Sequence, residues 1–183
     1  MSKLILITGG ARSGKSSYAL ELAESLSEKR LFVATCPTID PEMSERVRRH
    51  QEEREGRGWQ TIETELDLKD LLSNIGTKYD VILIDCITLW VNNLLFDAEK
   101  KGVVVTDRIV ADLCREWIET TRNQQNVVIC VTNEVGLGIV PENPLARKYR
   151  DLVGTANQMI GKAAGDVALV SCGIPLYIKQ NSK

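Results

Sequence analysis

The chain has 183 residues, of which 43% are hydrophobic and 26% charged, and its formal net charge at pH 7 is −2. This composition is typical of a globular protein, and the length suits a single domain over residues 1–183. The near-neutral charge argues against a global basic field for nucleic acid or acidic membranes, so we expect no nucleic-acid partner.

The first half of the chain alternates short apolar runs with segments of helical period. The expected elements are a strand at Leu4–Thr8, a helix at Ser16–Lys29, a strand at Leu31–Ala34, an exposed helix at Pro41–Arg57, a short strand at Trp59–Glu63, a helix at Leu66–Ile75 and a strand at Val81–Ile84. Gly56, Gly58 and Gly76 close the second and third helices.

The second half begins with an irregular stretch, Phe96–Val105, which we interpret as a surface loop available to a partner. The elements expected after it are a helix at Thr106–Arg122, a buried strand at Val127–Val131, a helix at Pro144–Ala164 and a strand pair at Val167–Val170 and Leu176–Ile178. Buried strands between helices predict an α/β fold, with a mostly parallel sheet, helices on both faces and an antiparallel terminal pair.

Location is predicted from absences in the sequence. No segment is apolar enough over a sufficient length to span a bilayer, and the first residues lack the pattern of a signal peptide. The five cysteines stand singly without metal-ligand spacing, which favours core packing in a reducing compartment. We therefore expect a cytoplasmic protein.

The segment from Gly9 to Ser16 matches the phosphate-binding pattern G-x-x-x-x-G-K-[ST]. Glycines let the backbone N–H groups face a phosphate, and the following helix directs its N-terminus at the same anion. Lys15 can reach the β- and γ-phosphates, and Ser16 can ligate Mg²⁺. The expected strand before the loop and helix after it are the setting that this motif requires, so we predict nucleoside triphosphate binding.

Asp85 ends the apolar run Val81–Ile84, as the acidic residue of a Walker B strand does. A carboxylate at that position can hold Mg²⁺ through water. The alternative is a strand-ending aspartate that caps a turn. Asn133 and Glu134 also follow a predicted strand, where they could bind a substrate or orient its hydroxyl group, although a polar turn is the simpler interpretation.

The single histidine, His50, lies between Arg46 and Arg54 on one face of the expected helix. Two neighbouring cations disfavour the protonated imidazole, and a neutral imidazole can attack phosphorus. Spacing alone favours the simpler interpretation, a solvated, salt-bridged helix that happens to contain a histidine. Trp59 and Trp90 could flank an aromatic ligand, but core packing is the simpler interpretation for both.

Taken together, the motifs resemble the bifunctional adenosylcobinamide kinase/adenosylcobinamide-phosphate guanylyltransferase family over nearly the whole chain. The matching segments are Gly9–Ser16, Val33–Thr35, Asp40–Met43, Arg46 with His50 and Arg54, Trp59–Glu63, Asp85–Trp90, Val131–Gly136, Gly138–Pro141, Arg150 with Asp151, Gly154, Asn157 and Gln158, and Gly173–Pro175. Cys36 departs from the small residue expected there, without evident consequence.

The resemblance implies two reactions. ATP or GTP would phosphorylate adenosylcobinamide, and GTP would then guanylylate His50, which would pass GMP to adenosylcobinamide phosphate. It further implies a RecA-like sheet, a homotrimer and these nucleotide contacts: Gly9, Gly10, Ala11, Arg12, Ser13, Gly14, Lys15, Ser16, Val33, Ala34, Thr35, Gln51, Glu52, Glu53, Arg54, Glu63 and Asp85. Catalysis would fall to His50 and Lys15, and Mg²⁺ binding to Ser16 and Asp85.

One phosphate-binding loop would have to present γ-phosphorus in the first reaction and α-phosphorus in the second. We therefore expect the segment Pro41–Arg57 to change position between the steps. Two other functions stay open on the residues alone. One is a single-activity metabolite kinase in which His50 is inert, and the other is a non-catalytic RecA-like nucleotide-binding module.

Overall fold

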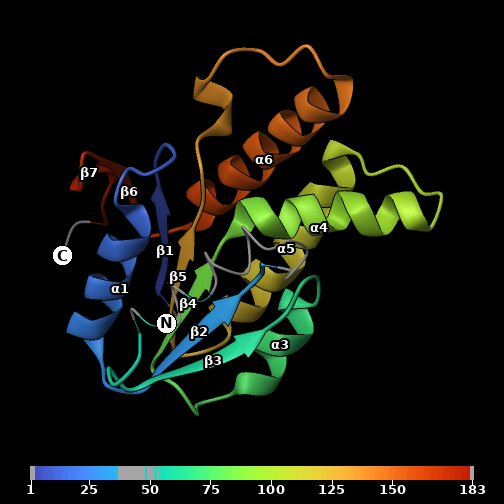
Figure 1. Cartoon of the computed structure of the whole chain (residues 1–183). Coiled ribbons are helices and arrows are strands. Elements are labelled where there is room, and N and C mark those ends of the chain that lie inside the picture. Colours follow the sequence, from blue (N-terminus) through green and yellow to red (C-terminus); the bar gives the residue numbers. More distant parts are fainter. Residues whose placement is uncertain (1–2, 37–47, 49–51, 53, 182–183) are drawn as a thin grey trace.

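The computed structural model describes residues 3–36, 48, 52 and 54–181 (Figure 1). The strands are β1 (Lys3–Thr8), β2 (Arg30–Ala34), β3 (Trp59–Glu63), β4 (Val81–Asp85), β5 (Val127–Val131), β6 (Asp166–Ser171) and β7 (Ile174–Lys179). The helices are α1 (Lys15–Leu26), α3 (Leu68–Ile75), α4 (Ile87–Lys100), α5 (Asp107–Arg122) and α6 (Pro144–Ala163), with a 3-10 turn η1 (Val135–Leu137). The predicted helix at Pro41–Arg57 falls largely outside the described residues.

The strands form one sheet in the order β3-β2-β4-β5-β1-β6-β7. Every neighbouring pair from β3 to β6 is parallel, and only the terminal pair of β6 and β7 is antiparallel. This confirms the predicted fold class. Within the part of the chain that the structure describes, no helix is long and apolar enough to cross a membrane.

Both faces of the sheet are covered, which explains why its central strands read as unbroken apolar runs. In β1, Leu4 and Leu6 belong to one core cluster, whereas Ile5 and Ile7 belong to the other. Helix α1 packs on the Ile5 face, and α3, α5 and α6 pack on the Leu4 face (Figure 1). Trp117 of α5 is fully buried in the larger cluster.

Helix α4 corrects the sequence interpretation at Phe96–Val105. The helix continues to Lys100, so only residues 101–105 form the expected loop. No glycine or proline lies between Ile87, the first residue of α4, and Gly102, and Lys101 forms an i,i+4 ion pair with Asp97 that suits a helix. The sparse apolar residues of this helical end reflect its position: α4 projects beyond the edge of the sheet, so much of its surface is not against the core (Figure 1).

The parallel strands all end at one edge of the sheet, and their register aligns the residues of interest there. Ala34 at the end of β2 pairs with Glu63 on one side and with Asp85 on the other. Asp85 in turn pairs with Val131, which also lies beside Ile7 of β1. In open α/β sheets this carboxyl edge is where ligands bind.

Candidate nucleotide site at the carboxyl edge of the sheet

The segment Gly9–Ser16 connects β1 to α1 in a tight loop that only particular residues allow. Gly14, the N-cap of α1, has a φ of 90°, and a Cβ there would lie 2.9 Å from the Cα of Gly173. A Cβ on Gly9 would lie 2.4 Å from the carbonyl oxygen of Val170. Arg12 also has a positive φ, of 55°. The loop is therefore fixed by left-handed backbone at Arg12 and Gly14 and by close approach to β6 and to the turn between β6 and β7.

The N-terminus of α1 is suited to an anion. No side chain caps it, and its first turn contains no acidic residue. Its first N–H groups are therefore not satisfied by a local side chain, and the helix dipole adds positive potential at the same place. Ser16, a predicted Mg²⁺ ligand, lies in this first turn and is half-buried.

Lys15 folds back over the loop. Its side chain is buried, with a relative exposure of 7% for the residue, and Nζ donates a hydrogen bond of 3.0 Å to the carbonyl oxygen of Gly10. The ammonium group is thus held inside the curve of the phosphate-binding loop. A small rotation of this long side chain would bring it to a phosphate seated there.

Asp85 ends β4 beside a turn that Thr35 holds in place. The Thr35 hydroxyl donates to the carbonyl oxygen of Cys86 and accepts from the Cys86 N–H, both at 2.8 Å. Thr35 was a predicted nucleotide contact; the structure buries it completely and engages its hydroxyl in this turn. Asn93 of α4 adds a 2.8 Å hydrogen bond to the Thr35 carbonyl oxygen.

The pKa of the Cys86 thiol is shifted by burial and by charged groups near this turn. Burial, followed by the negative charge of Asp85, raises the pKa of the thiol to about 11. The Lys15 ammonium is among the smaller influences that lower it. The strand-end carboxylate and the loop lysine therefore both act electrostatically on the buried Cys86 thiol, with opposite signs.

The remaining predicted nucleotide contacts differ in burial and in their position in the fold. Val33 is buried within β2, Ala34 is half-buried at its end, and Glu63 is exposed at the end of the neighbouring β3. Glu52 is exposed and forms an ion pair with Arg48. Arg54 is buried, with its guanidinium 3.6 Å from the centroid of the Phe32 ring. His50, Gln51 and Glu53 lie outside the described residues.

The end of β5 is tied to the phosphate-binding loop by a polar network. The Glu134 N–H donates to the Gly9 carbonyl oxygen at 3.2 Å, and the Thr8 hydroxyl donates to Glu134 Oε1 at 2.5 Å. Asn157 of α6 accepts from the Thr132 hydroxyl at 2.7 Å and donates to the Asn133 carbonyl oxygen at 3.1 Å. This network supports the simpler interpretation of Asn133 and Glu134 as a polar strand-end turn.

Several residues of the site were missed from sequence. Thr8 and Asn93 carry no motif of their own, and Asn93 lies on α4, which the pattern did not predict. Trp59 and Trp90 both pack in or against the core: Trp90 is buried, and Trp59 starts β3 at the amino end of the parallel strands, with its indole N–H bonded to Glu24 at 2.8 Å. Cys86, Cys114 and Cys130 are buried as predicted, Cys36 is half-buried and Cys172 is exposed.

Residues 5–178 match the family model described as cobinamide kinase / cobinamide phosphate guanyltransferase. The chain belongs to this family. It is 40% identical over 182 residues to the bifunctional adenosylcobalamin biosynthesis protein CobU of Salmonella typhimurium, covering 96% of this chain and 99% of that one. The Escherichia coli CobU is 37% identical with the same coverage, and the Pseudomonas aeruginosa protein CobP is 33% identical, covering 95% and 96%.

Solved structures share the fold at low sequence identity. The flagellar accessory protein FlaH from Methanocaldococcus jannaschii has a TM-score of 0.54 at 16% identity, covering 98% of this chain and 79% of that one. A KaiC-like protein from Pyrococcus horikoshii has a TM-score of 0.52 at 15% identity, with coverages of 91% and 71%. These likenesses establish a RecA-like P-loop fold, and family membership makes the chain a bifunctional cobinamide kinase/guanyltransferase enzyme.

Proposed function

We propose that the chain carries out two successive reactions of cobalamin biosynthesis at the carboxyl edge of its sheet. ATP or GTP phosphorylates the hydroxyl group of the aminopropanol arm of adenosylcobinamide. GTP then guanylylates His50 with release of pyrophosphate, and His50 passes the GMP to adenosylcobinamide phosphate, which gives adenosyl-GDP-cobinamide. The observation that carries this proposal is the phosphate-binding loop, with buried Lys15, at the same edge of the sheet as Asp85 in a member of this family.

The same loop serves both reactions in different ways. In the kinase step Lys15 and the N-terminus of α1 stabilise charge on the transferred γ-phosphoryl group. In the guanylyl step they hold the departing pyrophosphate while the imidazole of His50 attacks α-phosphorus. The P–O bond to pyrophosphate breaks as the N–P bond forms. The attacking nitrogen needs a free lone pair, and therefore the mechanism requires a neutral His50 imidazole.

The residues present fit Mg²⁺, the metal that such chemistry requires. Ser16 offers a hydroxyl oxygen at the start of α1, and Asp85 offers a half-buried carboxylate at the end of β4. Hard oxygen donors of this kind, together with substrate phosphates, are the ligands that Mg²⁺ prefers. The bound ion would neutralise charge on the phosphate oxygens, while Ser16 and Asp85 fix its place.

Labelling with GTP tests the proposal. After incubation with GTP radiolabelled at the α-phosphate and denaturation, wild-type protein should retain label that is acid-labile and alkali-stable, and His50→Ala should retain none. Phosphorylation of cobinamide should persist in His50→Ala. If wild type retains no label but consumes ATP only when cobinamide is present, the protein is a plain kinase. No turnover of any kind would indicate a non-catalytic nucleotide-binding module.

The single domain over residues 1–183, the cytoplasmic location and the homotrimer remain predictions. One surface supports assembly of copies. Ile174, Leu176 and Ile178 alternate along β7, the edge strand of the sheet, and are 70%, 61% and 62% exposed. An edge strand with such a stripe is suited to contact with another chain.

A further inference from the structure

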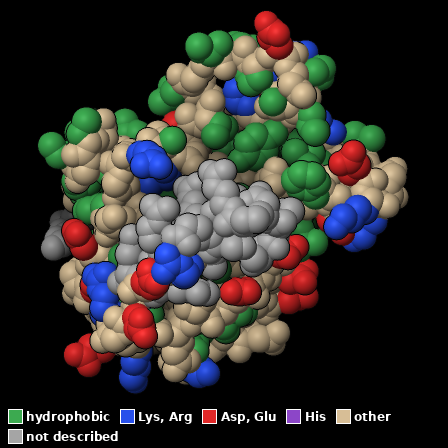
Figure 2. Space-filling model, viewed as in Figure 1, with side chains coloured by type: hydrophobic (Ala, Val, Ile, Leu, Met, Phe, Trp, Pro, Cys, Tyr) green, Lys and Arg blue, Asp and Glu red, His purple; other side chains and the backbone are tan. Residues whose placement is uncertain are grey.

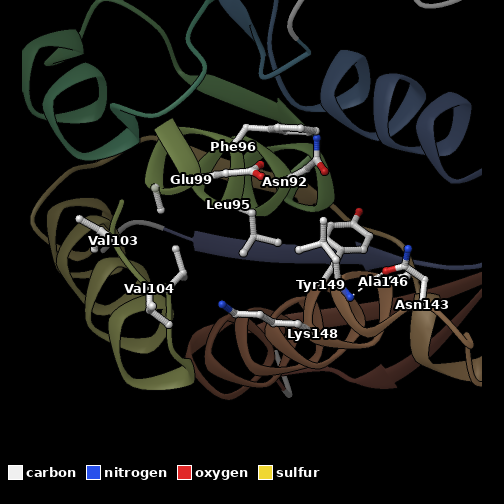
Figure 3. Close-up of a pocket in the computed structure, with 13 residues that line it drawn as sticks. Asn92, Leu95, Phe96, Glu99, Val103, Val104, Asn143, Ala146, Lys148 and Tyr149 are labelled. Carbon is white, nitrogen blue, oxygen red and sulfur yellow. Dashed lines mark hydrogen bonds between the residues drawn. The ribbon is translucent and has the colours of Figure 1, made fainter. Parts of the chain in front are cut away.

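A cavity of about 500 Å³ lies between α4, residues 103–105 and the first turns of α6 (Figure 3). Its apolar walls include Phe96, Val103, Val104 and Leu145, which are 47%, 55%, 67% and 55% exposed. Figure 2 shows hydrophobic side chains gathered on this face over α4 and α6. Apolar groups left in water around a hollow indicate a binding surface, because burying them is favourable.

The polar groups of the cavity indicate the kind of ligand. Asn92 and Glu99 lie on the α4 wall, and Asn143 and Lys148 lie on the α6 side (Figure 3). Asn143 Oδ1 already accepts the N–H groups of Leu145 and Ala146, at 2.8 and 3.1 Å, so the amide NH₂ is what this side chain can offer. The carboxylate of Glu99 and the ammonium group of Lys148 carry opposite charges, so the charges of the lining cancel. The lining therefore suits an uncharged, amide-bearing, largely apolar ligand better than a phosphate.

The cavity is connected to the nucleotide edge through α4. Tyr149 lines its inner end and donates a 3.2 Å hydrogen bond to the carbonyl oxygen of Thr88, three residues after Asp85. Asn92 follows Thr88 by one helical turn on the same helix. A ligand seated between α4 and α6 can therefore extend an arm past the N-terminus of α4 toward Asp85 and the phosphate-binding loop.

We propose that this cavity seats the corrin ring of cobinamide and so directs its aminopropanol arm to the nucleotide. The inference rests on the proposed function and assigns the acceptor site of the same reactions. A corrin is a flat macrocycle with methyl groups on an apolar ring and uncharged amides around its rim. Phe96, Val104 and Leu145 contact one side of the ring, and the amides of Asn92 and Asn143 bind groups on its rim.

Equilibrium dialysis of cobinamide, followed by its visible absorbance, tests this assignment in the full chain. Val104→Asp places a charge in the cavity and should weaken cobinamide binding by about tenfold or more. Val140→Asp is the matched control, since Val140 is a valine of similar exposure, 61%, and does not line the cavity. Retention of label from GTP should be equal in wild type and both variants. Phe96→Ala, which adds no charge, should weaken binding in the same direction.

Other results overturn the assignment. Binding that is unchanged in Val104→Asp and Phe96→Ala, or that is absent from wild type, excludes the cavity. If Val104→Asp and Phe96→Ala lose binding and also change the molar mass measured by light scattering, while Val140→Asp does neither, the surface is an interface between copies. If Gln158→Ala alone weakens binding, the ring lies instead in the hollow between α6 and β7. Binding that depends on Val104 without any phosphorylation of cobinamide supports the site and contradicts the proposed function.

Discussion

At the scale of single residues, the phosphate-binding loop could be predicted from sequence because its chemistry and its geometry require the same residue types. Gly9 and Gly14 are needed for space and for backbone conformation, and Lys15 is needed for charge. Thr35 and Asn93 could not be predicted in the same way. Their roles depend on which carbonyl groups the folded strands bring near them, and any buried polar residue that meets such a carbonyl could serve.

Lys15→Ala should lower both activities, because both reactions need the triphosphate held in the same loop. Loss of one charged donor at a transferring phosphoryl group costs about 3 kcal/mol, or roughly a hundredfold to a thousandfold in kcat/KM. Cobinamide-dependent ATP consumption and retention of label from GTP measure the two activities. Lys69→Ala is the control, since Lys69 is an exposed lysine paired with Glu116 on the protein surface. A loss confined to one activity would mean that the reactions use different phosphate sites.

At the scale of elements, strand positions were easier to predict than the extent of α4. Buried parallel strands have unbroken apolar sequences, whereas the projecting end of α4 faces solvent and the cavity, so its pattern is not that of a core helix. The start of α5 was predicted at Thr106, and in the structure Thr106 is its N-cap, with the hydroxyl accepting from the Ile109 N–H at 3.4 Å. Local chemistry thus located that helix start, whereas the end of α4 lacks the apolar period by which a core helix is recognised.

Asn93→Ala should destabilise the fold by about 1–3 kcal/mol, because the Asn93 amide donates to the carbonyl oxygens of Thr35 and Glu65, at 2.8 and 3.1 Å. Without it, α4 loses its link to the turns after β2 and β3. Urea unfolding measures the change in free energy. Asn92→Ala is the matched control, since it makes the same substitution on the same helix and lines the cavity rather than this buried contact. Equal midpoints for the two variants would show that the buried amide contributes nothing.

At the scale of the whole molecule, the candidate nucleotide site, the cavity and the exposed apolar strand lie at different places around the sheet. The carboxyl edge gathers the loop, Lys15 and Asp85, and residues of α4 and of the first turns of α6 line the cavity. Both helices project beyond the sheet (Figure 1). The antiparallel strand β7 closes the sheet on one side and exposes an apolar stripe. The sequence predicted a mostly parallel sheet with an antiparallel terminal pair but not the order of its strands, since the pairing of β1 with both β5 and β6 joins segments more than a hundred residues apart.

Leu176→Glu should reduce the molar mass of the protein in solution if the β7 stripe holds copies together in the predicted homotrimer. A carboxylate in the middle of an apolar contact has to be desolvated without a partner, whereas on the isolated chain the side chain is 61% exposed and the change costs little. Light scattering after size-exclusion chromatography measures the mass. Leu26→Glu, at a 44% exposed leucine ending α1, serves as control. A monomeric wild type would refute the homotrimer, and a trimeric Leu176→Glu would place the interface elsewhere.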